Sequence, residues 1–159
     1  MKPLMLGMAL CLVALACGPP TAVGPDLTVL ITYSRVPTSA DSSAVVALGV
    51  RRALMIRVAS AIAARGPAAP ERYGVRPDVL RSQPCGWDED PVVSVYIDVV
   101  DAPTPEDSAF VVSLGVIGPV RLRVTTISTG MRLGAVARLG ERSRFTKVEI
   151  GCTNIVPLS

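Results

Sequence analysis

Four cysteines carry most of the reactive chemistry that this sequence offers, because it contains no histidine. Without histidine, Ser-His and Cys-His nucleophilic pairs and His-containing zinc sites are excluded. Cys11 and Cys17 lie in an apolar N-terminal segment, whereas Cys85 and Cys152 lie far apart in the rest of the chain. No Cys-x-x-Cys spacing occurs, so we expect a structural disulfide between Cys85 and Cys152. Two free buried thiols are the first alternative, and a metal or redox role is the second.

The acidic residues offer little further chemistry. Asp88–Asp90 could present carboxylate oxygens to Ca²⁺, but the run lacks the alternating spacing and the glycine of a calcium loop, so we expect a solvated loop and no metal. Asp98 and Asp101 could form an acid-base pair, yet we expect one on a strand and the other in a loop. Lys147 is the only lysine besides Lys2, and no Ser-x-x-Lys motif or glycine-rich phosphate loop is present. We therefore expect no enzyme and no cofactor.

Charge is distributed unevenly along the chain. Asp88 to Asp107 holds seven acids and no base, whereas Arg121 to Lys147 holds seven bases and only Glu141 as an acid. Neighbouring acidic and basic strands could neutralise each other through cross-strand pairs. Alternatively, one strand face could bind anionic lipid headgroups, lipopolysaccharide or an acidic partner. That candidate face consists of Arg121, Arg123, Arg132 and Arg138. The net charge of +3 gives no indication of a nucleic-acid-binding protein.

The N-terminal segment is typical of a targeting signal. Lys2 precedes a nearly unbroken apolar run, Leu4–Ala16, which is shorter than the roughly 20 residues of a membrane-spanning helix and typical of a signal peptide. Val13-Ala14-Leu15-Ala16-Cys17 resembles the lipobox of bacterial lipoproteins. The resemblance implies that residues 1–16 are removed and that Cys17 carries acyl chains, palmitate among them. Residues 17–26 would then form a flexible tether between the membrane and the domain.

Other N-terminal outcomes stay open. Ala14-Leu15-Ala16 also fits the ordinary signal peptidase, which would release a secreted or periplasmic soluble protein, and an uncleaved anchor is a third possibility. Gly18 follows the cysteine where inner-membrane lipoproteins commonly have Asp. The lipoprotein resemblance therefore implies an outer-membrane location facing the periplasm.

The first half of the domain predicts one strand and one long helix. Leu27–Arg35 alternates as a strand with one buried face. Ala44–Arg65 is rich in helix-forming residues, can be capped by Asp41 or Ser42, and ends at Gly66-Pro67. Gly66–Pro91 is expected to be irregular, with room for a short helix at Arg76–Ser82.

The second half predicts a run of antiparallel strands, and we recognise no internal repeat. Gly118-Pro119 and Thr129-Gly130 are the expected turns. The expected strands are Val92–Val100, Ala109–Ile117, Val120–Ser128, Met131–Leu139 and Phe145–Cys152. The sequence thus predicts a single α+β domain over residues 27–159, with a mostly antiparallel sheet of five to six strands and one long helix packed on a face.

The strand Leu27–Tyr33, the long helix and the later Ile127-Ser128-Thr129-Gly130 are weakly similar to the N-terminal domain of TolB and to CsgG-like envelope domains. This resemblance implies a periplasmic protein-protein module, and it transfers no functional residue. We expect a non-enzymatic cell-envelope lipoprotein that acts as an accessory or scaffold subunit for an envelope protein partner. The alternative is a binding module for anionic lipid or lipopolysaccharide on the arginine face.

Overall fold

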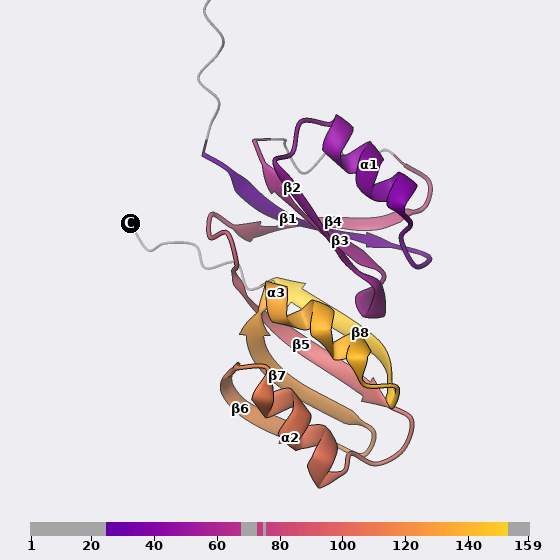
Figure 1. Ribbon diagram of the computed structural model, residues 1–159, viewed down its shortest axis with the longest axis vertical. Coiled ribbons are helices and arrows are strands. Elements are labelled where there is room, and N and C mark those ends of the chain that lie inside the picture. The colour runs from indigo at the N-terminus through magenta and orange to yellow at the C-terminus, as the bar shows by residue number, and fades with distance from the viewer. Residues whose placement is uncertain (1–24, 68–72, 75, 153–159) are drawn as a thin grey trace, which may run out of the picture.

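The computed structural model describes residues 25–67, 73–74 and 76–152 of the chain. These residues form two four-stranded antiparallel sheets that are stacked along the long axis of the molecule (Figure 1). The first sheet has the strand order β2-β3-β1-β4, and the second has the order β6-β7-β5-β8. The α+β class is confirmed, but the prediction of one sheet with five to six strands and one long helix is wrong.

The strand and helix bounds are as follows. The first half contains β1 (Leu27–Tyr33), α1 (Ser39–Ala47), β2 (Arg52–Ile56), the short 3-10 helix η1 (Arg57–Ala59), β3 (Ala61–Gly66) and β4 (Val79–Gly86). The second half contains β5 (Val92–Val99), α2 (Pro105–Ser113), β6 (Val116–Leu122), β7 (Thr126–Arg132), α3 (Leu133–Val136), the 3-10 helix η3 (Ala137–Glu141) and β8 (Phe145–Cys152).

The two halves are an internal repeat, which corrects the expectation that none exists. Each half runs strand, helix, strand, strand, strand, and each sheet places these strands in the same spatial order. An offset of 66 positions aligns Pro37–Val50 with Pro103–Val116, and nine of the fourteen residues are identical. The same offset relates the cross-strand pair Ile31–Ser82 of β1 and β4 to the pair Ile97–Val148 of β5 and β8. In both pairs of strands, a β-bulge follows one residue later. The repeat therefore extends to strand register.

Both helices of the repeat begin and end in the same way. Thr38 caps α1 and Thr104 caps α2, each in a reciprocal capping box with an aspartate three residues later. Thr38, rather than the expected Asp41 or Ser42, is thus the first cap. Each helix ends in a leucine followed by a glycine with positive φ, Gly49 at 90° and Gly115 at 82°. Glycine adopts this conformation without strain, so it stops both helices.

The predicted long helix Ala44–Arg65 is wrong because tertiary pairing overrides the helix propensity of its second half. The helix ends before Gly49, and the chain turns back through Ser60, whose φ is 47°, to pair β2 with β3. The segment Gly66–Pro91 is also more regular than expected. It contains β4, which pairs with β1 where a short helix had been considered.

Two further strands that the sequence predicts in the second half are wrong. The segment Ala109–Ile117 is mostly helical, because the Thr104 cap and Pro105 at the first turn start α2 ahead of it. The segment Met131–Leu139 is largely helical too, since its buried residues Leu133, Val136 and Leu139 recur every three positions. The alternation of small and larger residues in this segment favours a strand, but burial follows the helical period.

The expected turns also lie inside strands. Gly118-Pro119 is part of the irregular edge strand β6, and Thr129-Gly130 is part of β7. A Cβ atom at Gly130 would lie only 2.6 Å from the carbonyl oxygen of Ile117, so the close approach of β6 requires glycine there. The strands at Leu27–Arg35, Val92–Val100 and Phe145–Cys152 are confirmed within one or two residues.

Two apolar cores hold the molecule together. The smaller core lies between α1 and the first sheet, and includes Val29, Ile31 and Val45. The larger core joins the two repeats, because it contains Leu30 and Ala63 of the first sheet together with many residues of the second. Consequently β1 is buried on both faces and not on one as expected, which accounts for the apolar Leu30 on the face that also carries Thr28 and Thr32.

Candidate functional site: a cleft between two edge strands

One cleft of the molecule lies where the two sheets meet. Strands β4 and β8 are edge strands of their respective sheets, and they lie beside each other across the junction. The disulfide between Cys85 and Cys152 joins them, which confirms the expected pairing. A cleft of about 630 Å³ opens between the sheets and is lined by both strands.

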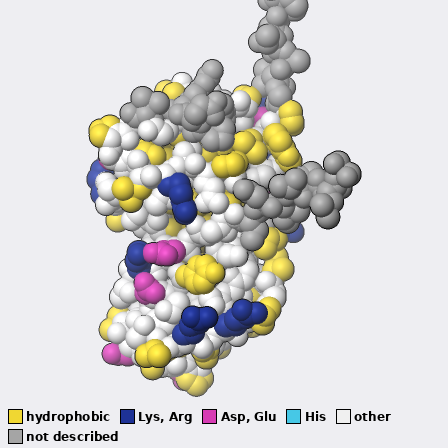
Figure 2. Space-filling model, turned by 180° about the vertical axis from the view of Figure 1, so that it is seen from behind, with side chains coloured by type: hydrophobic (Ala, Val, Ile, Leu, Met, Phe, Trp, Pro, Cys, Tyr) yellow, Lys and Arg dark blue, Asp and Glu magenta, His cyan; other side chains and the backbone are white. Residues whose placement is uncertain are grey.

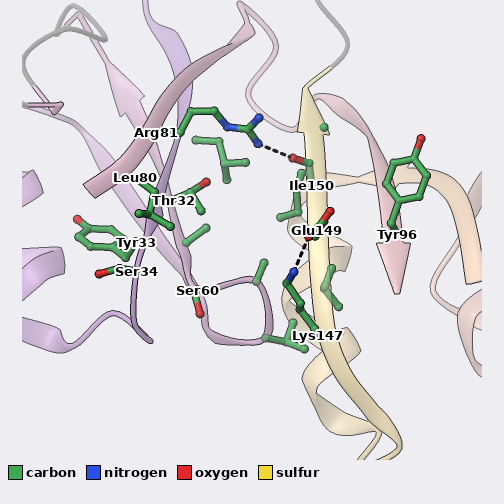
Figure 3. A pocket seen from close by; sticks show the side chains of 16 residues that line it. Thr32, Tyr33, Ser34, Ser60, Leu80, Arg81, Tyr96, Lys147, Glu149 and Ile150 are labelled. Carbon is green, nitrogen blue, oxygen red and sulfur yellow. Dashed lines mark hydrogen bonds and ion pairs between the residues drawn. The ribbon is translucent and has the colours of Figure 1, made fainter. Parts of the chain in front are cut away.

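Side chains of β4 bridge the strands next to the disulfide. Arg81 Nη2 donates a hydrogen bond to the carbonyl oxygen of Ile150 at 3.3 Å (Figure 3). Gln83 Nε2 donates a hydrogen bond to the carbonyl oxygen of Cys152 at 3.1 Å. Both partners advance by two residues, so β4 and β8 run in the same direction here. The bridges satisfy edge carbonyls of β8 that have no strand partner within the described residues.

The interior of the cleft is apolar. Leu30, Ala61, Val148 and Ile150 line it and are buried, as members of the core that joins the repeats. Leu80 stands at the wall of the cleft with 68% of its surface exposed. An apolar interior beside an exposed leucine is suited to an apolar ligand group.

The mouth of the cleft carries an ion pair. Lys147 Nζ lies 2.5 Å from Glu149 Oε1, and Figure 3 shows both side chains on β8. This hydrogen bond raises the pKa of Lys147 and lowers the pKa of Glu149. The lysine is therefore a cation at neutral pH, not a nucleophile, and the exposed pair contributes little to stability. Tyr96, half exposed, lies on the neighbouring strand.

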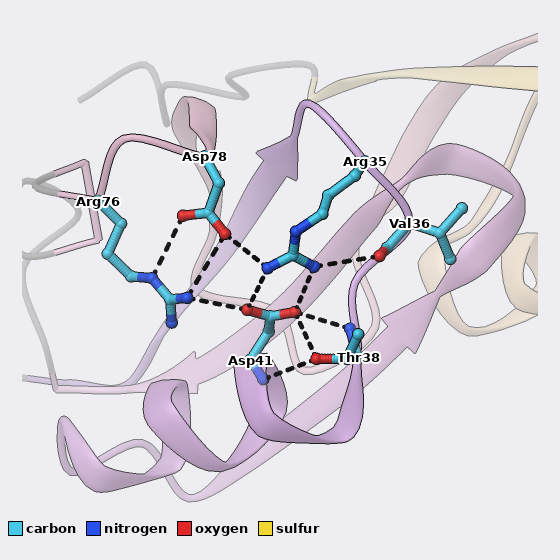
Figure 4. Close-up of polar contacts among 6 residues, drawn as sticks. All are labelled: Arg35, Val36, Thr38, Asp41, Arg76 and Asp78. Carbon is cyan, nitrogen blue, oxygen red and sulfur yellow. Dashed lines mark hydrogen bonds and ion pairs between the residues drawn. The ribbon is translucent and has the colours of Figure 1, made fainter.

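A buried aspartate in the first repeat gathers a polar network (Figure 4). Asp41 is 2% exposed and accepts hydrogen bonds from both guanidinium amino groups of Arg35, at 2.7 and 2.9 Å. Arg76 Nη2 donates to it at 2.9 Å, and Thr38 donates through its N–H and its hydroxyl. The Arg35 bonds, followed by the Thr38 N–H, hold the pKa of Asp41 far below its usual range.

Asp107 forms the corresponding network in the second repeat. It is fully buried and accepts from Arg142 at 2.8 Å and from Arg144 at 3.0 Å. The N–H of Thr104 donates to it at 3.0 Å. Burial by itself would raise the pKa of Asp107, but these hydrogen bonds outweigh burial and hold the pKa far below its usual range. Each network joins the first turn of a helix, α1 or α2, to the segment that precedes the last strand of the same repeat, β4 or β8. We therefore assign both networks a structural role.

The four arginines of the expected basic face are not brought together on one set of strands. Arg121 and Arg123 are exposed on β6 and just after it. Arg132, at the end of β7, pairs with Asp88 at 3.0 Å, and Arg138 lies in η3, where it pairs with Glu141. The face shown in Figure 2 carries two neighbouring basic side chains, while its other basic side chains lie apart from these and one of them lies beside acidic side chains.

The acidic candidates have local partners. Asp90 Oδ1 accepts the N–H of Gly134 at 2.7 Å, and hydrogen bonding from the Asp90 N–H and from Arg132 lowers the pKa of Asp88. Asp98 lies on β5 opposite Lys147, and its carboxylate accepts a hydrogen bond from Thr126. In the described part of the chain, no three His, Cys, Asp or Glu side chains group as a metal site. Cys17 and the segment before it lie outside the described residues.

Sequence reasoning missed the cleft and both buried aspartates. The cleft depends on how two distant strands meet, which no local pattern reports. The aspartates were detectable, because Thr-x-x-Asp-Ser recurs 66 positions later within an otherwise similar segment. Comparison with protein-family models, curated proteins and solved structures finds no match to this chain. Among the helices that the structure describes, none is long and apolar enough to cross a membrane.

Proposed function

We propose that this protein is a non-enzymatic lipoprotein of the bacterial cell envelope, and that it acts as an accessory subunit by binding another protein. The observation that carries the proposal is the sequence Val13-Ala14-Leu15-Ala16-Cys17 at the end of an apolar run. Acylation of Cys17 would anchor the domain to a membrane. The TolB-like and CsgG-like resemblance of the domain stays a prediction.

Two features of the folded domain support this proposal. The Cys85–Cys152 disulfide suits an oxidising compartment outside the cytoplasm, which is where a cleaved lipoprotein would fold. The lining of the cleft includes the exposed Leu80 and the half-exposed Tyr96, which suits a binding surface. In the ion pair at its mouth, Lys147 is held in its charged form by Glu149.

The intact mass of the protein purified from membranes tests the anchor. We expect a chain that begins at Cys17 and carries diacylglyceryl and acyl groups, together with a gain of two hydrogen masses on reduction. The Cys17→Ser variant is the control and should appear unacylated. An unmodified chain in the soluble fraction would refute the anchor and support secretion instead.

One specific observation favours a second function, in which the domain binds anionic lipid or lipopolysaccharide on an arginine-rich strand face. Arg121, Ser128, Tyr96 and Glu149 are successive cross-strand partners on four strands, so an arginine and a half-exposed tyrosine share one face. Neither Arg121 nor the nearby Arg123 has an ion-pair partner among the described residues. Salt-dependent binding to anionic vesicles that is lost in Arg121→Glu/Arg123→Glu would support this function. A stoichiometric protein partner that is insensitive to these changes would support the first.

A further inference from the structure

We propose that the end of the first sheet that carries Trp87 lies against the membrane to which Cys17 is anchored, with the indole ring of Trp87 at the level of the lipid headgroups. The inference deepens the proposed function and rests on its acylated Cys17. It adds a second contact between the protein and the lipid, and it assigns which end of the domain faces the membrane.

Trp87 is the only tryptophan of the chain, and 56% of its surface is exposed. It directly follows β4, whose last residue, Gly86, pairs with Thr28 of β1. The backbone at this point is held by hydrogen bonds from β3. Arg65 Nη1 donates to the carbonyl oxygen of Trp87 at 3.0 Å and to that of Asp88 at 2.9 Å. The exposed indole ring is therefore carried by a fixed part of the backbone.

The expected tether joins the domain at this same end of the sheet. β1 begins at Leu27, beside the end of β4. Only eight residues separate Cys17 from Asp26, and a fully extended chain of this length spans about 30 Å. A tether this short gives the attached surface an effective concentration in the millimolar range. Even a weak attraction between Trp87 and lipid is then sufficient to keep this end of the domain on the membrane.

Arginines lie at the same end, because β2 begins and β3 ends there. The exposed Arg51 pairs with Asp26 at 3.2 Å, and the exposed Arg52 pairs with Glu89 at 3.1 Å. Exposed ion pairs of this kind contribute little to stability, so both guanidinium groups can bind lipid phosphates in place of the carboxylates. Since the acidic partners offset these charges, the indole ring and not a net positive charge directs this end to the membrane.

The second repeat carries different residues at the corresponding positions. The offset of 66 positions places Ile117 at the position of Arg51 and Thr153 at the position of Trp87. The arginine and the tryptophan thus occur in the repeat that the tether joins and are not shared with the other repeat. We expect this difference if the first repeat alone meets the membrane.

The chemistry of tryptophan and arginine fits the boundary between headgroups and acyl chains. The indole ring of tryptophan buries a large apolar surface, while its N–H needs a polar acceptor, and both needs are met at this boundary. Arginine can lay its apolar stem along the boundary and keep its guanidinium group among the phosphates. The expected ligand of this end is thus the phospholipid bilayer that holds the acyl chains of Cys17.

The fluorescence of Trp87 provides the test, because the chain has no other tryptophan. The full-length protein, shown by its mass to be acylated, is reconstituted into vesicles of phosphatidylethanolamine and phosphatidylglycerol. We expect the emission of Trp87 to lie at a short wavelength, as for a ring that is partly removed from water. Phospholipids brominated on their acyl chains should quench this emission strongly, because quenching requires contact with the lipid.

The double variant Trp87→Phe/Val124→Trp is the matched control, since it moves the single tryptophan to another exposed position. Val124 is 85% exposed, and it lies beyond the far end of β5, where Asp98 pairs with Thr126. The emission of this variant should stay at a long wavelength, and brominated lipid should quench it several-fold less. Equal emission and equal quenching in the two proteins would overturn the inference.

A protein ligand of Trp87 would also overturn it. In that case the emission of Trp87 would shift only when a copurifying protein is present, and brominated lipid would not quench it. Trp87 would then belong to a protein-protein interface and not to a membrane contact.

These outcomes are separate from those of the proposed function. An acylated Cys17 without quenching of Trp87 would remove only this inference. Quenching of Trp87 in an acylated chain that binds no protein would keep it and remove the accessory role. A chain without acyl groups would remove the anchor and this inference together.

Discussion

Asp41 and Asp107 each organise one repeat through the same small set of contacts. Each aspartate accepts the N–H of a capping threonine and binds two arginines, and Arg76 and Arg142 occupy equivalent positions. At two other equivalent positions, the repeats carry opposite charges. The first repeat has Arg35 and Asp78 where the second has Asp101 and Arg144. The second arginine therefore follows the first strand in the first repeat (Arg35) and precedes the last strand in the second repeat (Arg144). Each aspartate nevertheless binds two arginines.

Replacing Asp107 tests its structural role. Asp107→Ala removes the carboxylate half of the Thr104–Asp107 capping box and leaves two arginines without their partner, so we expect a loss of about 2–4 kcal/mol in the free energy of unfolding. Glu106→Ala is the control, because Glu106 is an exposed residue of the same helical turn, and it should change stability by less than about 0.5 kcal/mol. Urea denaturation followed by circular dichroism measures both. Equal effects of the two variants would contradict the assigned role.

The lowered pKa values of Asp41 and Asp107 predict acid sensitivity. A carboxyl group with a lower pKa in the folded state than in the unfolded state takes up protons on unfolding. Its stabilisation is fully present above the unfolded pKa of about 3.9 and is lost as the pH falls through that value and below it. We expect the free energy of unfolding to decline from about pH 5 downward.

The Asp41→Asn/Asp107→Asn double variant checks this origin. It should be less stable at neutral pH, and its stability should fall less steeply between about pH 5 and pH 3. Denaturant titrations at a series of pH values give both slopes. Parallel curves for the variant and the unchanged protein would assign the acid sensitivity to other carboxylates.

At the scale of single elements, the sequence predicted the strands whose alternation is regular. β5 and β8 each have one face in the core and one outside, so period-two patterning located them correctly. The helix α2 was missed for a physical reason. Phe110, Val112 and Leu114 alternate, yet Val111 is the fully buried residue and Val112 is 53% exposed. The capping box at Thr104 was a better guide than the alternation.

Glycine at the helix ends gives a prediction at this scale. Gly115→Ala should cost about 1 kcal/mol of unfolding free energy, because Gly115 has a φ of 82°, a conformation that strains any residue with a Cβ atom. Gly140→Ala is the control. A Cβ atom at Gly140 would make only an ordinary contact of 3.7 Å with Val58, and its φ is not positive. Thermal unfolding of both variants measures the difference, and a neutral Gly115→Ala would refute the helix-stop argument.

At the scale of the whole molecule, two copies of one unit share a core, and equivalent faces of the two copies differ in burial. Leu30 of the first repeat is buried in that core, whereas its equivalent in the second repeat, Tyr96, is half exposed. The cleft lies where this asymmetric packing leaves β4 and β8 unpaired with each other. The sequence could not predict the cleft, because its two walls come from strands whose contact is set only by the packing of the repeats.

The disulfide is the covalent link across this junction, and its removal is the decisive test of how the repeats depend on each other. Closing a loop with the 67-residue separation of Cys85 and Cys152 contributes about 4 kcal/mol in the chain-entropy model. The Cys85→Ala/Cys152→Ala variant should therefore unfold at a lower urea concentration, and reducing agent should affect only the unchanged protein. A single cooperative transition in the variant would mean that the shared core around Leu30 couples the repeats without the covalent link. Two separate transitions would mean that the disulfide, and not the core, makes the cleft a fixed feature of the molecule.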